Sequence, residues 1–268
     1  MDEEVGGWPG AAGVAVVGPS GVLAATGADE PYPWASVTKI LSALTILLAC
    51  ADGVLDLDDP AGPPGATLRH LLGHTSGLAF DADRTLAPPG KRRIYSNRGI
   101  EVAAEVLEKH TGRPFADLVT QHVLVPLGMT RSRLDGSPAR DGSGPVSDLA
   151  LLAHELLVPR VLDPALVALA GTTSYAGTAG VLPGFGRQDP NDWGLGLEVR
   201  GHKSPHWTSP LNSPSTFGHF GQSGSFLWVD PVARLACVSA GDTPYDTWAA
   251  EAWPRLSTRV LETHRSTS

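Results

Sequence analysis

Three short groups of residues in this chain have the types and spacing that acyl-transfer chemistry requires. The first is Ser36-Val37-Thr38-Lys39, just ahead of an apolar stretch rich in Leu, Ile and Ala. Residues three apart on a helix lie on one face, with about 5–6 Å between Cβ atoms, so the spacing would place an amine beside a hydroxyl. A serine is a weak nucleophile near neutral pH and needs an adjacent base, which a lysine provides when burial lowers its pKa. We therefore predict Ser36 as nucleophile and Lys39 as base, although the four residues alone favour a simpler interpretation, an N-cap serine followed by a lysine that extends to solvent.

The second group is Tyr95-Ser96-Asn97, which precedes a predicted helix. A tyrosine phenol relays a proton between a nucleophile or leaving group and a neighbouring lysine. An asparagine amide both donates to and accepts from a substrate amide. These residues predict a catalytic Tyr95 and a substrate-binding Asn97. The alternative is a loop tyrosine that packs on the core.

The third group lies in the glycine-rich stretch 218–224, ahead of a predicted strand. Glycine lets a strand edge approach a ligand closely. We predict His219, Gly221 and Gln222 as substrate-binding residues, with the Gln222 N–H as an oxyanion donor beside that of Ser36. Taken alone, a glycine-rich entry to a strand is usually only a turn.

The elements that must position these groups follow from apolar periodicity and turn residues. A hairpin is predicted over 10–27, and Ser36 is placed at the N-cap of a helix over 37–51. The middle of the chain is predicted to be helical over 67–72, 99–110, 114–124 and 147–157, the last with an N-cap at Ser147-Asp148. Strands are predicted over 193–199, 226–230 and 235–240, followed by a last helix over 245–263.

Strands at both ends of the chain with helices between them predict an α/β (α+β) fold. We expect one antiparallel sheet flanked by terminal helices and completed by the C-terminal part, with an inserted all-helical domain. The sheet domain would consist of residues 1–52 and 172–268, and the helical domain of residues 53–171. The active site is expected in the cleft between them, where ligand sites are common.

In this order, the three groups resemble the superfamily of class C β-lactamases, D-alanyl-D-alanine peptidases and family VIII esterases. The resemblance extends over about residues 9–240 and includes the stretches 35–39, 55–60, 74–78, 95–97, 193–196 and 218–221. It implies a β-lactamase/transpeptidase-like fold, acylation of Ser36, proton handling by Lys39 and Tyr95, and a substrate contact from Asn97. The helix that usually precedes the first strand in this superfamily is largely missing.

Two residues depart from the β-lactamase pattern. His219 and Phe220 stand where β-lactamases usually carry the first two residues of a Lys-Thr-Gly triplet, whereas histidine there is common in the esterase and peptidase relatives. A mostly neutral histidine offers less fixed charge to a substrate carboxylate. The expected function is therefore a serine hydrolase that acts through an acyl-enzyme on small-molecule esters or amides. The alternatives are an acyltransferase, a true β-lactamase and a catalytically idle binding protein on the same fold.

Composition excludes several other classes. The formal net charge of -8 disfavours nucleic-acid binding, and the run Lys91-Arg92-Arg93 is interpreted as a solvated loop. The longest apolar stretch, 40–51, is shorter than the ~20 residues of a membrane span. The N-terminus is acidic where a secretory signal would be basic, so a cytoplasmic location is predicted, which disfavours cell-wall or antibiotic substrates.

No cofactor or metal is expected. His70 and His74 have the spacing of a helical metal pair but lack an intervening glutamate, and the acidic loop 56–59 lacks the glycine and glutamate of a calcium loop. Cys50 and Cys237 are interpreted as two buried free thiols. The oligomeric state is left open.

Overall fold

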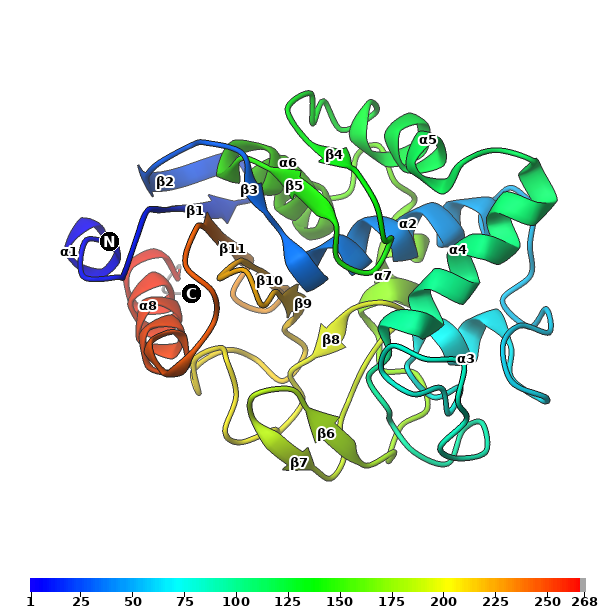
Figure 1. Cartoon of the computed structure of the whole chain (residues 1–268). Coiled ribbons are helices and arrows are strands. Elements are labelled where there is room, and N and C mark those ends of the chain that lie inside the picture. The colour runs from blue at the N-terminus through cyan, green and yellow to red at the C-terminus, as the bar shows by residue number, and fades with distance from the viewer. Residues whose placement is uncertain (266–268) are drawn as a thin grey trace.

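A six-stranded antiparallel sheet forms the centre of the fold (Figure 1). The computed structural model describes residues 1–265. In chain order the strands of this sheet are β1 (Ala12–Gly18), β2 (Gly21–Gly27), β8 (Glu198–Val199), β9 (Phe217–Phe220), β10 (Phe226–Asp230) and β11 (Leu235–Gly241). Their spatial order is β2-β1-β11-β10-β9-β8, so the N-terminal hairpin pairs with the last strand of the chain. This arrangement confirms the predicted sheet that the C-terminal part completes.

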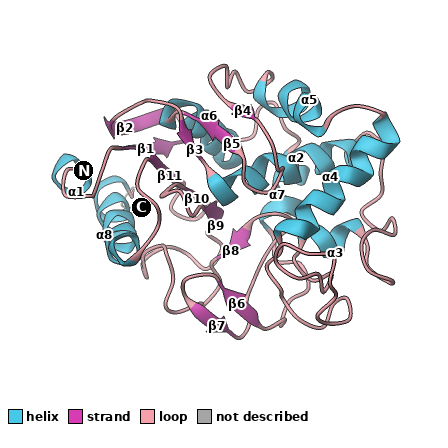
Figure 2. Cartoon of the chain, in the orientation of Figure 1, coloured by secondary structure: helices cyan, strands magenta, loops and turns pink. Residues whose placement is uncertain are grey.

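Helices cover the sheet and fill the middle of the chain (Figure 2). They are α1 (Asp2–Val5), α2 (Thr38–Ala51), α3 (Leu68–Leu72), α4 (Asn97–Thr111), α5 (Phe115–Val119), α6 (Val146–Leu157), α7 (Pro164–Gly171) and α8 (Thr247–His264). A 3₁₀ turn at Ala35–Val37 precedes α2, and a π-helical turn at Thr120–Leu124 follows α5. Two small sheets complete the fold, β3 (Tyr32–Pro33) with β5 (Gly142–Gly144) and β4 (Arg133–Leu134), and the hairpin of β6 (Gly180–Leu182) and β7 (Gly186–Gln188).

Alternation along the central strands produces two hydrophobic cores. In β1, Val14 and Val16 belong to the core that contains Trp253 of α8, whereas Ala15 and Val17 belong to the core that contains α2, α4 and α6. Successive side chains of a strand point to opposite faces, so one apolar strand buries surface on both sides of the sheet. Figure 1 shows α1 and α8, the first and last helices, near each other, and Arg255 of α8 pairs with Glu4 of α1.

Several predicted elements need correction. The strand predicted over 193–199 is reduced to Glu198–Val199, because Gly196 adopts φ +80°, which breaks the extended backbone. His219 was predicted to lie in a loop ahead of a strand, but it belongs to β9. This strand pairs with β10. Gly218 within this short strand and Gly221 directly after it hide its pattern in the sequence.

Two predicted helix caps are also wrong. Ser36 lies inside the 3₁₀ turn, and α2 starts at Thr38 without a side-chain cap. The hydroxyl of Ser147 donates to Asp29 instead of capping α6, whose N-cap position is Pro145. By contrast, Ser96 accepts a hydrogen bond from the Gly99 N–H, so α4 starts two residues before the predicted position.

The proposed division into a sheet domain and a helical domain remains a prediction. α6 falls within the range 53–171, yet it packs against β1, β10 and β11. α2, assigned to the sheet domain, contacts α4, α5 and α7. If the two units exist, these two helices join them through a shared core.

Three further features bear on the sequence analysis. Within residues 1–265, no helix is long and apolar enough to cross a membrane. Cys50 and Cys237 are both free, as predicted, although Cys50 is only half-buried. Arg93 is buried and donates to the carbonyls of Gly73, Asn191 and Ser174, so the solvated loop predicted for 91–93 is wrong at this residue.

Candidate active site

Ser36 lies in a turn whose backbone is unusual. The preceding residue, Ala35, has φ +43°, a left-handed conformation that residues with a Cβ seldom adopt. Such strain persists where the surrounding structure imposes it, and it clusters at functional sites. The turn allows the Ser36 hydroxyl to bond with two side chains instead of capping α2.

The first of these side chains is Lys39, which is fully buried. Its Nζ donates to Ser36 Oγ at 3.1 Å, to Asn97 Oδ1 at 2.6 Å and to the Ala139 carbonyl at 2.8 Å. Burial lowers the pKa of Lys39 from its ordinary 10.5 to about 7. Near neutral pH the amine therefore exists partly in the neutral form, which can accept a proton. The solvent-directed lysine that the motif alone favoured is excluded.

Tyr95 is the second partner of Ser36. Its hydroxyl donates to Ser36 Oγ at 2.7 Å, and Lys39 Nζ lies 4.7 Å from the centre of its ring. Burial raises the pKa of Tyr95 above its ordinary value, so the phenol stays protonated near neutral pH. The same oxygen thus contacts one proton acceptor and one proton donor.

Asn97 occupies the first turn of α4, next to Tyr95, and both ends of its amide bond to protein groups. Its oxygen accepts from Lys39, and its nitrogen donates to Asp81 Oδ1 at 2.9 Å. One amide hydrogen is left for a substrate. The predicted substrate contact is untested, and the contact with Lys39 is an additional one.

His219 lies in β9 and is buried against Trp193 and Tyr95, with ring centroids 5.4 Å and 5.8 Å away. Its Nδ1 hydrogen-bonds with the Phe220 carbonyl at 2.7 Å, and its Nε2 has no partner among the described residues. Burial lowers the pKa of His219 to about 3, and the charge of Lys39 adds to the lowering. The ring is therefore neutral, in agreement with the expectation from sequence.

Gly221 approaches protein backbone. A Cβ at this position would lie 2.2 Å from the Trp34 carbonyl oxygen and 3.1 Å from the Ala35 Cβ. Only glycine lets the end of β9 pack against the segment that leads to Ser36. Gly221 thus closely approaches this segment, and its predicted contact with a substrate remains a prediction.

Gln222 is exposed, and its side chain donates to the Tyr245 carbonyl at 2.9 Å. It follows Gly221, so its backbone lies beside the turn that holds Ser36. The predicted role of its N–H toward an oxyanion remains a prediction.

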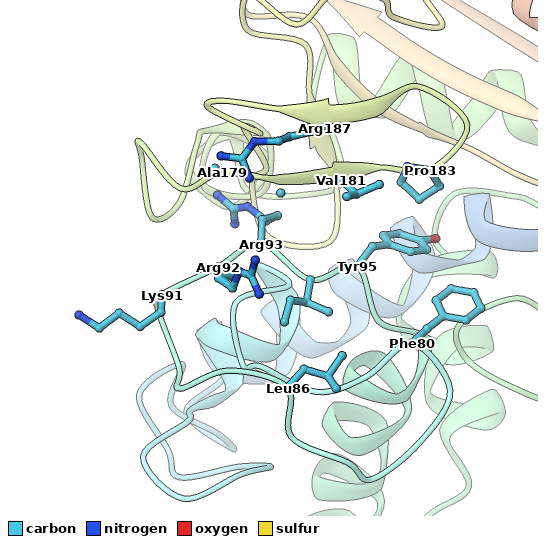
Figure 3. A pocket seen from close by; sticks show the side chains of 12 residues that line it. Phe80, Leu86, Lys91, Arg92, Arg93, Tyr95, Ala179, Val181, Pro183 and Arg187 are labelled. Atoms are coloured by element: carbon cyan, nitrogen blue, oxygen red, sulfur yellow. The ribbon is translucent and has the colours of Figure 1, made fainter.

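A cavity of about 300 Å³ lies in front of Ser36, and we call it the inner cavity. Its lining is mostly apolar and aromatic and consists of Ser36, Phe80, Tyr95, Leu182, Pro183, Trp193, Glu198, His219, Phe220 and Gln222. A larger space of about 810 Å³, the outer pocket, shares Phe80, Tyr95 and Pro183 with it (Figure 3). Small-molecule sites have this character, a concave apolar wall with a few polar groups.

Glu198 is a lining residue that the sequence analysis did not identify. Its carboxylate is buried and bonds to Lys203, to His206 Nε2 at 3.0 Å and to Trp207 Nε1 at 3.1 Å. Burial alone would raise the pKa of Glu198, but His206 and Lys203 outweigh it and hold the pKa at about 2. These partners hold the Glu198 carboxylate in one position in the lining of the cavity.

Two contacts of Lys39 and Asn97 were also missed. The Ala139 carbonyl is a backbone group in a loop with no recognisable motif, so no sequence signal identifies it. Asp81 lies sixteen residues before Asn97, in a loop whose aspartates give no distinguishing pattern.

The two histidines considered for a metal serve separate local contacts. His70 Nδ1 accepts from the Thr67 N–H in a capping box at the start of α3. His74 Nδ1 accepts from the Ser96 N–H, and its ring packs 4.7 Å from that of Tyr95. His74 thereby helps to hold the Tyr95 loop in place.

Comparisons with known proteins identify the family and the fold. The sequence profile of the family described as Beta-lactamase matches residues 3–258. A crystal structure of a beta-lactamase from Mycobacterium bovis is 49% identical and superimposes with a TM-score of 0.96, over 98% of this chain and 99% of that chain. Esterase EstB of Burkholderia gladioli is 28% identical over 81% of this chain and 79% of the esterase. Penicillin-binding protein 4* of Bacillus subtilis is 29% identical over 38% of this chain, and that match spans only 30% of its own length.

Proposed function

Because this chain belongs to the Beta-lactamase family, whose members are serine hydrolases, we propose that it cleaves esters or small amides through an acyl-enzyme on Ser36. The observation that carries the proposal is the position of Ser36 Oγ, which bonds both to Lys39 Nζ at 3.1 Å and to the Tyr95 hydroxyl at 2.7 Å. A nucleophile within reach of both a base and an acid is the arrangement that covalent catalysis needs.

Acylation starts when Ser36 Oγ forms a bond to the substrate carbonyl carbon. The Ser36 proton moves to the neutral Lys39 amine, which keeps Asn97 and the Ala139 carbonyl as acceptors for its other hydrogens. The carbonyl electron pair moves to oxygen, where backbone N–H groups of Ser36 and Gln222 are the proposed donors.

The tetrahedral intermediate then loses its leaving group. Tyr95 gives its phenolic proton to the departing oxygen or nitrogen and receives a proton from Lys39, whose Nζ lies near its ring. The carbon–heteroatom bond breaks, and the acyl group stays on Ser36. Deacylation follows the same steps, with water as the nucleophile and Ser36 Oγ as the leaving group. The product is a free acid, which leaves the site.

The walls of the inner cavity favour neutral acyl groups. Among its lining residues only Glu198 carries a charge, which Lys203 balances. His219 is neutral and Phe220 is apolar, so the cavity offers no cation to a β-lactam carboxylate. This supports ester or amide cleavage over antibiotic hydrolysis.

A true β-lactamase is the second candidate, because the Mycobacterium bovis protein that is 49% identical is described as a beta-lactamase. Acyl transfer to an alcohol or amine instead of water uses the same acyl-enzyme and needs only a different acceptor. A catalytically idle binding protein is disfavoured, because binding alone requires no buried lysine of lowered pKa beside a serine.

The proposal is tested by intact-mass spectrometry after brief exposure to an aryl ester, a cephalosporin or a D-alanyl peptide. We expect one added acyl mass on the wild-type protein and, after digestion of the labelled protein, on the peptide that contains Ser36. The Ser36→Ala variant serves as the matched control. A protein that gains no acyl mass from any of the three, and turns none of them over, would contradict the proposed function.

A further inference from the structure

The outer pocket concentrates positive charge beside the proposed nucleophile, although the chain as a whole has a formal charge of -8. Every charged residue in its lining is a cation, namely Lys91, Arg92, Arg93 and Arg187. Arg93 is committed to backbone carbonyls, which leaves the other three.

These three cations are available to a ligand. Lys91 and Arg92 are exposed and form no ion pair within the described part of the chain. Arg187 is exposed, and its one ion pair among residues 1–265 is with Asp189, directly after β7, at 3.1 Å. An exposed pair of this kind contributes little and is readily exchanged for a ligand anion.

An apolar segment separates these cations from the site of reaction. Figure 3 shows Arg92 and Arg187 toward one end of the pocket, and Phe80, Tyr95 and Pro183 toward the other. That second end is shared with the inner cavity. Leu86, Ile94 and Val181 supply apolar lining.

The side of the scissile bond follows from the proton path. A leaving atom protonated by Tyr95 must lie within hydrogen-bond reach of its phenol, so the group attached to that atom starts at Tyr95. Ser36 lines the inner cavity but not the outer pocket, whereas Tyr95 lines both, which favours the acyl group in the inner cavity and the leaving group in the outer pocket.

We propose that the outer pocket binds an anionic leaving group, in which an apolar segment joins the scissile oxygen or nitrogen to a carboxylate or phosphate held by Arg92 and Arg187. The inference rests on the proposed function and assigns the substrate class of that site. Lys91 adds to the local potential at the rim. Guanidinium groups suit this role because their planar donors match the geometry of a carboxylate.

The test uses two fluorogenic butyrate esters that differ only in a remote charge. One is the ester of 7-hydroxy-4-methylcoumarin, and the other is that of 7-hydroxycoumarin-4-acetic acid, whose rigid rings separate the carboxylate from the scissile oxygen. We compare kcat/KM for the two esters in wild type, Arg92→Gln, Arg187→Gln and the double variant. Taking the ratio of the two esters in each protein cancels general effects of a substitution.

We expect the ratio of anionic to neutral ester to fall about three- to tenfold in the double variant, mainly through KM, and the wild-type preference to shrink in high salt. Arg84→Gln is the matched control, because Arg84 is exposed on the neighbouring loop and does not line the pocket. The control should leave the ratio unchanged.

A second ester pair identifies the side of the scissile bond. It carries the charge on the acyl side, as the 4-methylcoumarin monoester of adipic acid and the matching neutral hexanoate. A loss confined to this pair would overturn the leaving-group assignment. If the double variant has the same ratio of anionic to neutral ester as wild type for the first pair, the inference is refuted. The proposed function would remain intact in that case, provided that wild type turns the esters over. No turnover of any ester by wild type would instead refute the proposed function, and the inference with it.

Discussion

Lys39 Nζ donates a 2.6 Å hydrogen bond to Asn97 Oδ1, so the amide predicted from sequence to contact substrate also holds the proposed base. The Asn97 nitrogen continues this chain of contacts to Asp81 Oδ1, which lies 3.3 Å from Arg140 Nη1. Two half-exposed charges on the surface are thereby connected to a fully buried amine. The ionisation of Lys39 consequently responds to residues that never contact Ser36.

The first prediction concerns the pH dependence of acylation. Asp81 raises the pKa of Lys39 and Arg140 lowers it, against the larger lowering by burial to about 7. The base form of Lys39 exists above this pKa, so the acylation rate should rise with pH through about 7. Asp81→Asn should move this acidic limb to lower pH, and Arg140→Gln should move it to higher pH, each by up to about one pH unit.

Stopped-flow acylation with an aryl ester between pH 5 and 9 measures these limbs. Molar salt should reduce both displacements, because the two charges are half exposed. Displacements in the same direction would show that Lys39 is not the titrating group.

The second prediction concerns Ser36. Ser36→Ala should abolish turnover and labelling by a fluorophosphonate probe, while the free energy of unfolding changes by no more than about 1 kcal/mol, since the hydroxyl caps no helix. Ser223→Ala, which removes a hydroxyl from the loop after β9, should be labelled normally. Labelling of the Ser36→Ala protein at the wild-type rate would remove Ser36 as the nucleophile.

The third prediction concerns Lys39 and Tyr95 as parts of one proton path. Each of Lys39→Met and Tyr95→Phe should lower the acylation rate by at least about a hundredfold. Groups that share one path do not add, so the double variant should be only slightly slower than the slower single variant. Pre-steady-state acylation of all four proteins measures this. Losses that multiply cleanly would mean that the two residues act independently.

The fourth prediction concerns substrate preference. Because the inner cavity offers neutral His219 and apolar Phe220 at the positions discussed above, short-chain aryl esters should exceed cephalosporins in kcat/KM by at least about tenfold, or about 1.4 kcal/mol. Steady-state kinetics on both substrate classes decides the order. Equal or faster cephalosporin hydrolysis would favour the β-lactamase alternative.

The fifth prediction concerns the contact between β9 and the turn before Ser36. Gly221→Ala places a Cβ 2.2 Å from the Trp34 carbonyl oxygen, so it should cost about 1–3 kcal/mol of stability and slow acylation. Gly99→Ala is the control, because its Cβ would meet nothing closer than 3.5 Å in the first turn of α4. Thermal unfolding of both variants measures the difference. A Gly221→Ala protein as stable and active as the control would show that the segment moves freely.

What the sequence determined by itself is local. The Ser36 and Lys39 pair could be predicted because a spacing of three residues at a helix start brings side chains together without help from the rest of the chain. Short runs of β-favouring apolar residues bounded by turn residues likewise predicted β1 and β10. The order of the three motifs was enough to identify the family.

The tertiary structure alone decided which distant groups surround Ser36. Tyr95 is 59 residues away from Ser36, and the Ala139 carbonyl that binds Lys39 is 100 residues away from the lysine. Such contacts depend on how the loops pack across α2, which local patterning does not encode. The same packing removes Lys39 and His219 from water, so their lowered pKa values, and with them the chemistry available at the site, arise only in the folded chain.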